Sequence, residues 1–143
     1  MTIRVRRTRT GDLELALRLE GQGGDARVAD LTRAFEGQRD ERVWMAFLDR
    51  EPAGFLVAGH FFGHPLVEQL QVDGRFRRLG VASRLMATLE EDTADRVFVS
   101  TNESNQAMRT LLVGRGYKVS GIIEDLDPGD PELFFVRFAG DLA

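Results

Sequence analysis

The chain has 143 residues, of which 43% are hydrophobic and 29% are charged, and its formal net charge is −4 at pH 7. These values are typical of a folded protein, and the length suits one core, so we expect a single domain over residues 1–143. A general nucleic-acid-binding protein would be expected to carry a basic surplus. The acidic balance therefore disfavours a nucleic-acid partner.

The sequence contains no cysteine and only two histidines, His60 and His64. Disulfides and thiolate metal sites are excluded, and we expect no bound metal. Residues 1–19 contain no unbroken apolar core of signal-peptide length, and no later stretch approaches the apolar length of a membrane span. We therefore expect a cytoplasmic protein without a membrane partner.

The first half of the chain predicts a strand, two helices and a three-stranded meander. Residues 3–6 (IRVR) are β-prone, and residues 10–22 and 25–37 show helical apolar spacing on either side of "GQGGD". Thr10 is the expected N-cap of the first helix. The three runs predicted to form the meander are residues 42–49, 53–62 and 66–72.

The second half predicts two helices and three strands. A helix begins near Gly80, and a second helix covers residues 104–116, where Gly114 or Gly116 can serve at its C-terminal end. The predicted strands are residues 96–101, 117–123 and 132–138. The resulting order, β-α-α-β-β-β-α-β-α-β-β, predicts one α/β domain.

Residues 72–91, "VDGRFRRLGVASRLMATLEE", place several arginines and Gly80 directly before a helix. A helix start presents unpaired N–H groups and the positive end of the macrodipole, so this arrangement predicts an anionic ligand. The dinucleotide and nucleoside-triphosphate fingerprints do not fit, because the glycines stand alone and no Lys-Ser or Lys-Thr pair follows Gly80. Part of the arginine content is compositional, since Lys118 is the only lysine.

The hexapeptide from Arg77 to Ala82 fits the pattern R-x-x-G-x-A. Its place between a strand and a helix resembles the acetyl-CoA site of the GCN5-related N-acetyltransferase (GNAT) superfamily. The family's order of elements matches nearly all of residues 3–138, including a helix asparagine at Asn105 and a Gly-Tyr pair at Gly116 and Tyr117. The resemblance implies the GNAT fold, in which a mixed, mostly antiparallel sheet is flanked by about four helices.

The resemblance also implies acetyl-CoA as the acyl donor. Backbone N–H groups of the loop and helix start would hold its pyrophosphate, and Gly80 would leave room for the phosphate while adopting backbone angles closed to other residues. The preceding strand and Asn105 would contact the pantetheine arm. The alternatives are that the loop arginines are simply solvated and that Asn105 caps its helix. The implied cofactor-binding residues are Leu70, Gln71, Val72, Arg77, Arg78, Leu79, Gly80, Val81, Ala82, Ser83 and Asn105.

Acetyl transfer to an amine requires a base, because an amine with a pKa of about 10.4 is protonated at neutral pH. Glu68 is the leading candidate, since it shares one face of the predicted strand with Leu70 and Val72. The alternative is that Glu68 lies on a solvated part of the sheet. By the resemblance, the backbone N–H of Val72 would stabilise the tetrahedral intermediate.

The general acid departs from the family pattern. Family members often carry Tyr seven residues after the helix asparagine, and Leu112, which has no donor, occupies that position. Water, Ser104 or Thr101 could supply the proton instead. Tyr117, the only tyrosine, is expected to pack in the core rather than to act in catalysis.

These observations predict an acetyl-CoA-dependent N-acetyltransferase that acetylates a primary amine of a small molecule or peptide by direct attack on the thioester. The alternative is a non-catalytic module of the same fold that binds or senses acetyl-CoA. The acidic turn at residues 124–130 either lies solvated or draws a cationic amine toward the cleft. A homodimer through the last strands is an expectation from the family alone.

Overall fold

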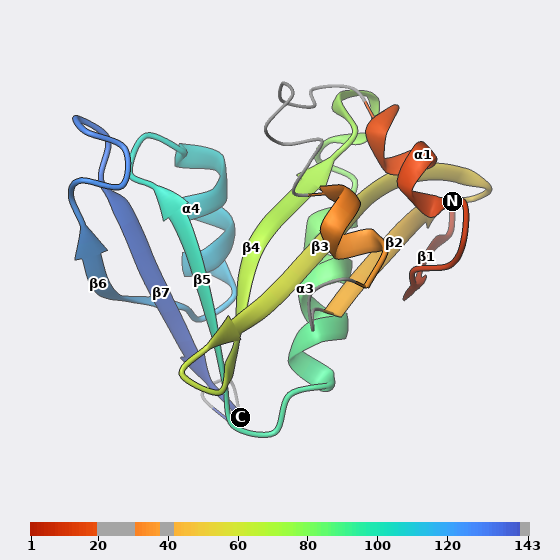
Figure 1. Cartoon of the computed structure of the whole chain (residues 1–143). Helices are drawn as coiled ribbons and strands as arrows, with labels where there is room; N and C mark the ends of the chain where they lie inside the picture. Colours follow the sequence, from red (N-terminus) through yellow and green to blue (C-terminus); the bar gives the residue numbers. More distant parts are fainter. Residues whose placement is uncertain (20–30, 38–41, 141–143) are drawn as a thin grey trace. The chain divides into compact units, whose positions relative to one another are not determined.

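The computed structural model describes residues 1–19, 31–37 and 42–140 (Figure 1). The described chain contains both strands and helices, and residues 31–35 are helical. This arrangement confirms the predicted α/β class. The elements in chain order are β1 (Ile3–Arg7), α1 (Asp12–Leu17), β2 (Arg42–Leu48), β3 (Glu51–Phe61), β4 (His64–Val72), the 3₁₀ turn η1 (Gly74–Phe76), α3 (Val81–Glu91), β5 (Arg96–Asn102), α4 (Gln106–Gly114), β6 (Lys118–Ile123) and β7 (Glu132–Phe138).

Within the described residues, seven strands form one sheet in the order β1-β2-β3-β4-β5-β7-β6. The pairs β1–β2, β2–β3, β5–β7 and β6–β7 are antiparallel. The pair β4–β5 is parallel, and its ladder joins Leu66 to Phe98 and Val67 to Val99. The sheet is therefore mixed and mostly antiparallel, as expected.

The chain forms two compact units, the first made of Met1–Gly59 and Glu68–Glu91. In this unit α1 and residues 31–35 cover one face of β2 and β3, and α3 covers the other (Figure 1). The apolar stripe of α3 points into the sheet, and Trp44 is buried. The fully buried side chains of α3 are Val81, Leu85, Met86 and Leu89.

The second unit contains His60–Val67 and the chain from Asp92 onward. Here α4 ends in a reverse turn in which Gly116, with φ of 87°, lets the N–H of Tyr117 reach the carbonyl of Leu112 at 2.9 Å. This pattern is a Schellman cap, so of the two glycines considered it is Gly116 that ends the helix. Leu112 and Tyr117 are both buried, and the predicted packing role of Tyr117 is confirmed.

The start of the first helix differs from the prediction. Gly11, with φ of 94°, is the N-cap in place of Thr10, and the helix begins at Asp12. No side chain caps this helix start, and the Asp12 carboxylate instead accepts the N–H of Arg9, before the helix, at 2.7 Å. The second predicted helix is confirmed at residues 31–35, and its earlier part lies outside the described residues.

No helix in the described ranges is both long enough and apolar enough to span a lipid bilayer.

Candidate functional site

The turn that leaves β4 is shaped by Asp73, a fully buried carboxylate. Its own N–H donates to the carbonyl of Ala53 at 2.8 Å. Its side chain accepts the N–H of Arg75 at 2.9 Å and the Nε of Arg75 at 3.1 Å. These bonds hold the chain against β3 while it turns away from the sheet, so the direction of the following loop is fixed from within the core.

A glycine on the neighbouring strand makes room for this turn. A Cβ placed on Gly54 would lie 2.5 Å from the carbonyl oxygen of Gln71 and 3.2 Å from Cγ1 of Val81. Real side chains do not approach so closely, so the end of β4 and the start of α3 pack directly on the Gly54 backbone.

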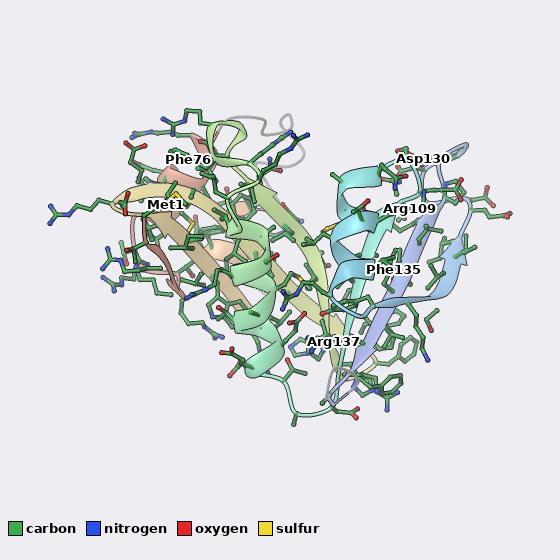
Figure 2. All side chains as sticks on the ribbon, turned by 180° about the vertical axis from the view of Figure 1, so that it is seen from behind. Met1, Phe76, Arg109, Asp130, Phe135 and Arg137 are labelled. Atoms are coloured by element: carbon green, nitrogen blue, oxygen red, sulfur yellow. The ribbon has the colours of Figure 1, made fainter. Side chains whose placement is uncertain are left out.

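The loop after η1 has an unusual backbone. Arg78 has φ of 65° and Gly80 has φ of 91°, both in the left-handed region. The positive φ of Gly80 is the backbone property that the sequence predicted for it. A non-glycine residue in this region is uncommon and carries strain, so the rest of the fold must hold Arg78 in place. Phe76 marks the turn in Figure 2.

This backbone leaves a series of N–H groups without acceptors. The first bond of α3 runs from the N–H of Arg84 to the carbonyl of Gly80 at 3.0 Å. In the described part of the chain, no acceptor takes a hydrogen bond from the N–H groups of residues 78–83. The guanidinium groups of Arg77 and Arg78 likewise form no ion pair with a carboxylate of the described residues. The loop and helix start therefore offer unpaired donors and positive charge to an anion.

The last residues of β4 lie in the same unit as this loop. Leu70, Gln71 and Val72 are partly buried, and they lie beyond the two-residue ladder between β4 and β5. Gln69 carries a buried side-chain oxygen with no hydrogen-bond partner among the described residues. The expected pairing of Leu70 and Val72 with a pantetheine arm stays a prediction.

Glu68 lies on the exposed face of β4, directly over Gly59 of β3. A Cβ on Gly59 would lie 2.5 Å from Oε2 of Glu68 and 3.1 Å from its carboxylate carbon. The missing side chain at Gly59 thus leaves room for the carboxylate. The role of Glu68 as a base stays a prediction, and the sequence did not identify Gly59.

Ser104 and Asn105 belong to the second unit, at the start of α4. The Oδ1 of Asn105 accepts the N–H of Met108 at 3.2 Å, which is an N-cap bond. The hydroxyl of Ser104 donates to Oδ2 of Asp130 at 2.6 Å, and the N–H of Ser104 donates to Oδ1 at 3.1 Å. Figure 2 labels Asp130 on the turn between β6 and β7. The predicted acidic turn is therefore tied to the start of α4.

The acidic turn also affects Glu132, the first residue of β7. Burial raises the pKa of this carboxyl above its ordinary value; a hydrogen bond from Ser100 opposes the rise, and the charges of Asp127 and Asp130 add to it. The side-chain amide of Asn102 donates to Oδ2 of Asp127 at 2.9 Å. The acidic turn is thus a hydrogen-bonded part of the second unit.

Neither Leu112, which occupies the usual tyrosine position, nor Tyr117 offers an exposed hydrogen-bond donor. Leu112 is fully buried, and Tyr117 has 4% exposure. Thr101, the other hydroxyl considered as a proton source, is also buried. Among the described residues, no group of three or more His, Asp or Glu side chains is arranged to hold a metal ion.

Asp73, Gly54 and Gly59 were not identified from the sequence. The "VDG" motif carries a turn signal that points to Asp73, because aspartate before glycine favours a side-chain-capped turn. The two glycines carry no such local signal. Their importance depends on which residues of β4 lie opposite them.

A sequence model described as "Acetyltransferase (GNAT) family" matches residues 13–117 of the chain. Among curated protein sequences, none matches. A solved GNAT-family acetyltransferase from Bacillus cereus is 28% identical, with a TM-score of 0.86 over 96% of this chain and 98% of that one.

Two further solved structures share the fold at lower identity. The ribosomal-protein-S18-alanine N-acetyltransferase from Escherichia coli is 14% identical, with a TM-score of 0.79 over 96% of this chain and 94% of that one. An aminoglycoside 6′-N-acetyltransferase complexed with coenzyme A is 15% identical, with a TM-score of 0.77 over 97% of both chains.

Proposed function

The chain belongs to the acetyltransferase (GNAT) family, and on that premise we propose that it transfers the acetyl group of acetyl-CoA to a primary amine of a small molecule or peptide. The observation that carries this proposal is the set of N–H groups at residues 78–83, which contain two left-handed residues and the start of α3 and which have no acceptor among the described residues. Such clustered donors match the oxygens of a pyrophosphate.

Acetyl-CoA supplies an activated thioester and a diphosphate by which it can be held. The N–H groups of residues 78–83 would bind the diphosphate, with Arg77 and Arg78 adding charge at the rim. Leu70, Gln71 and Val72 of β4 would receive the pantetheine arm. On the second unit, the Oδ1 of Asn105 is already engaged in capping α4.

Glu68 is the proposed base. An amine with a pKa of about 10.4 must lose a proton before it can attack, and a carboxylate can accept that proton directly or through water. Gly59 leaves room for the Glu68 carboxylate on the exposed face of β4. The N–H of Val72 would donate to the developing oxyanion, and one such donor is worth about 3 kcal/mol.

The leaving thiolate needs little help from a protein acid. By comparison with cysteine, the pKa of the coenzyme A thiol is about 8.5, so the thiolate is a fair leaving group near neutral pH. On the second unit, the hydroxyl of Ser104, a proposed proton donor, is engaged in donating a hydrogen bond to Asp130. Solvent is the simpler proton source.

The acceptor is proposed to be cationic before it is deprotonated. Asp125, Asp127 and Asp130 place negative charge in the turn between β6 and β7. Such a field raises the local concentration of a positively charged amine. The proposal covers both small-molecule and peptide amines.

A second candidate function, a module that binds acetyl-CoA without catalysis, is favoured by one observation. Leu112 fills the usual tyrosine position and is fully buried, so no donor is available there. Thiol release from acetyl-CoA during a screen of amines and N-terminal peptides separates the two functions. The enzyme releases one thiol per acetylated amine, whereas the binding module releases none with any acceptor.

Gly80 variants test the cofactor site itself. Gly80→Ala and Gly80→Glu both strain the left-handed backbone, but only glutamate adds a bulky anion where the diphosphate would bind. We expect coenzyme A to raise the melting temperature of Gly80→Ala and to leave that of Gly80→Glu unchanged. Equal coenzyme A affinity in the two variants would remove this loop from the site.

A further inference from the structure

An arginine-lined groove lies on the first unit, apart from the N–H groups of the loop. Its cavity volume is about 600 Å³, which is within the range of small-molecule sites. Ile3 and Phe47 contribute apolar surface to it. In Figure 2, nitrogen-tipped side chains gather around the strand that begins beside Met1. The arginines that line the groove are Arg4, Arg6, Arg9, Arg50 and Arg84.

The positive charge of this groove is only partly neutralised within the fold. Arg6 donates to Oδ2 of Asp12 at 2.7 Å. By contrast, Arg4, Arg50 and Arg84 form no ion pair with any carboxylate of the described residues, and no acidic residue lines the groove. Guanidinium groups gathered from β1, the β2–β3 turn and α3 repel one another in the free protein. A bound anion would remove that repulsion.

The groove is distinct from the proposed coenzyme A loop, although the two are adjacent. Ile3 lines the groove, and its Cδ1 lies 3.9 Å from the position of a Cβ on Gly80. Arg84 lines the groove with its side chain while its N–H bonds to the Gly80 carbonyl. None of residues 77–83 lines the groove. A diphosphate bound by the loop would therefore leave the guanidinium groups of the groove without an anion.

We propose that this groove is a second anion site, which binds a small organic polyphosphate of the nucleoside triphosphate class. Arginine favours such ligands because its planar guanidinium binds phosphate oxygens through paired hydrogen bonds. The apolar surface of Ile3 suits the base of a nucleotide, while the Phe47 ring carries the Arg6 guanidinium 4.8 Å from its centroid. The cavity has the size of a small-molecule site, so the ligand is a small nucleotide.

Isothermal titration of ATP into the full chain saturated with coenzyme A tests this proposal, because the coenzyme occupies the loop and leaves only the groove. We expect one ATP per chain and roughly tenfold weaker binding by Arg50→Gln. Arg18→Gln is the matched control: it removes the same charge from the same unit, but Arg18 lies outside the groove and pairs with Glu14 at the surface. We expect Arg18→Gln to bind ATP as the wild type does.

Three results would overturn the proposal: no ATP binding to the coenzyme-saturated chain, ATP displaced by coenzyme A, or equal loss of affinity in Arg50→Gln and Arg18→Gln. Displacement would assign the groove to the coenzyme's own nucleotide. If coenzyme A itself fails to bind, the proposed acetyltransferase function fails. In that case, the ATP affinities of Arg50→Gln and Arg18→Gln without coenzyme A still test whether the groove binds ATP.

Discussion

The carboxylate of Glu68 on β4 occupies the space that a side chain at Gly59 on β3 would fill. A Cβ on Gly59 would lie 2.5 Å from Oε2 of Glu68, which is too close for real atoms. The atom in the way is the end of a flexible side chain, so a methyl group at Gly59 would move the carboxylate rather than the strand. The space that the proposed base occupies thus depends on a glycine of the neighbouring strand.

Gly59→Ala is expected to fold normally and to lower turnover. If Glu68 is the base, both Gly59→Ala and Glu68→Gln reduce kcat, with Glu68→Gln losing roughly 10²-fold or more. Coenzyme A affinity stays unchanged in both variants, because neither touches residues 78–83. Steady-state kinetics and calorimetry with coenzyme A check the two halves of this prediction. Full turnover in Glu68→Gln, with an unchanged pH–rate profile, would exclude Glu68 from the reaction.

Asp73 is expected to support both stability and cofactor binding. Asp73→Ala removes the acceptor for the N–H and guanidinium of Arg75, and losing such charge-assisted bonds costs about 2 to 3 kcal/mol of unfolding free energy. We expect weaker coenzyme A binding as the turn before the loop loosens. Asp73→Asn keeps an acceptor for the Arg75 N–H and should lose less on both measures. Urea unfolding and calorimetry would contradict this role if Asp73→Ala matched the wild type.

Elements with strong local patterns were predictable. β7 covers Glu132–Phe138, as the sequence indicated, because its β-prone residues follow directly after the turn "DPGDP". The helix from Val81 begins one residue after Gly80, since that glycine separates the loop from a clear apolar stripe. The prediction of Thr10 as the N-cap of the first helix was wrong for a non-local reason. Asp12 pairs with Arg6 of β1, so the tertiary bond decides where the helix begins.

The candidate site was predictable only where a motif is continuous along the chain. The R-x-x-G-x-A pattern identified the loop, and the left-handed φ of Gly80 agrees with it. Gly54 and Gly59 act through contacts with β4 across the sheet, and their local sequence does not reveal which residues they face. Strand register supplies that information, and it is fixed only when the sheet forms.

The Arg6–Asp12 pair is expected to make stability depend on acid pH. Burial opposes ionisation of Asp12, but hydrogen bonds from Arg6 and from the Arg9 N–H, with the charges of both arginines, outweigh burial and hold its pKa below its ordinary value of 3.8. The pair therefore stabilises the fold above pH 3.8, and this contribution is lost as the pH falls through the lowered pKa. At pH 7 Asp12→Asn should cost about 2 kcal/mol in urea unfolding. A cost that did not shrink in acid would contradict the ionic origin of the effect.

Glu132 is expected to show the opposite dependence. Its pKa is raised above the ordinary value of 4.5, so the folded state binds a proton more tightly than the unfolded state. Its ionisation therefore lowers stability as the pH rises from 4.5 through the raised pKa. Glu132→Gln should be more stable than the wild type at pH 7 and equal to it in acid, while Glu124→Gln, exposed in the same turn, should change neither. A destabilised Glu132→Gln at pH 7 would contradict this account.

Backbone amide NMR of the ¹⁵N-labelled chain, titrated with coenzyme A, tests most directly whether the loop binds the diphosphate. We predict that saturation shifts the amide resonances of residues 78–83 more than any others in the first unit, because these N–H groups gain acceptors. Saturable binding that leaves those resonances unmoved would contradict the proposed site.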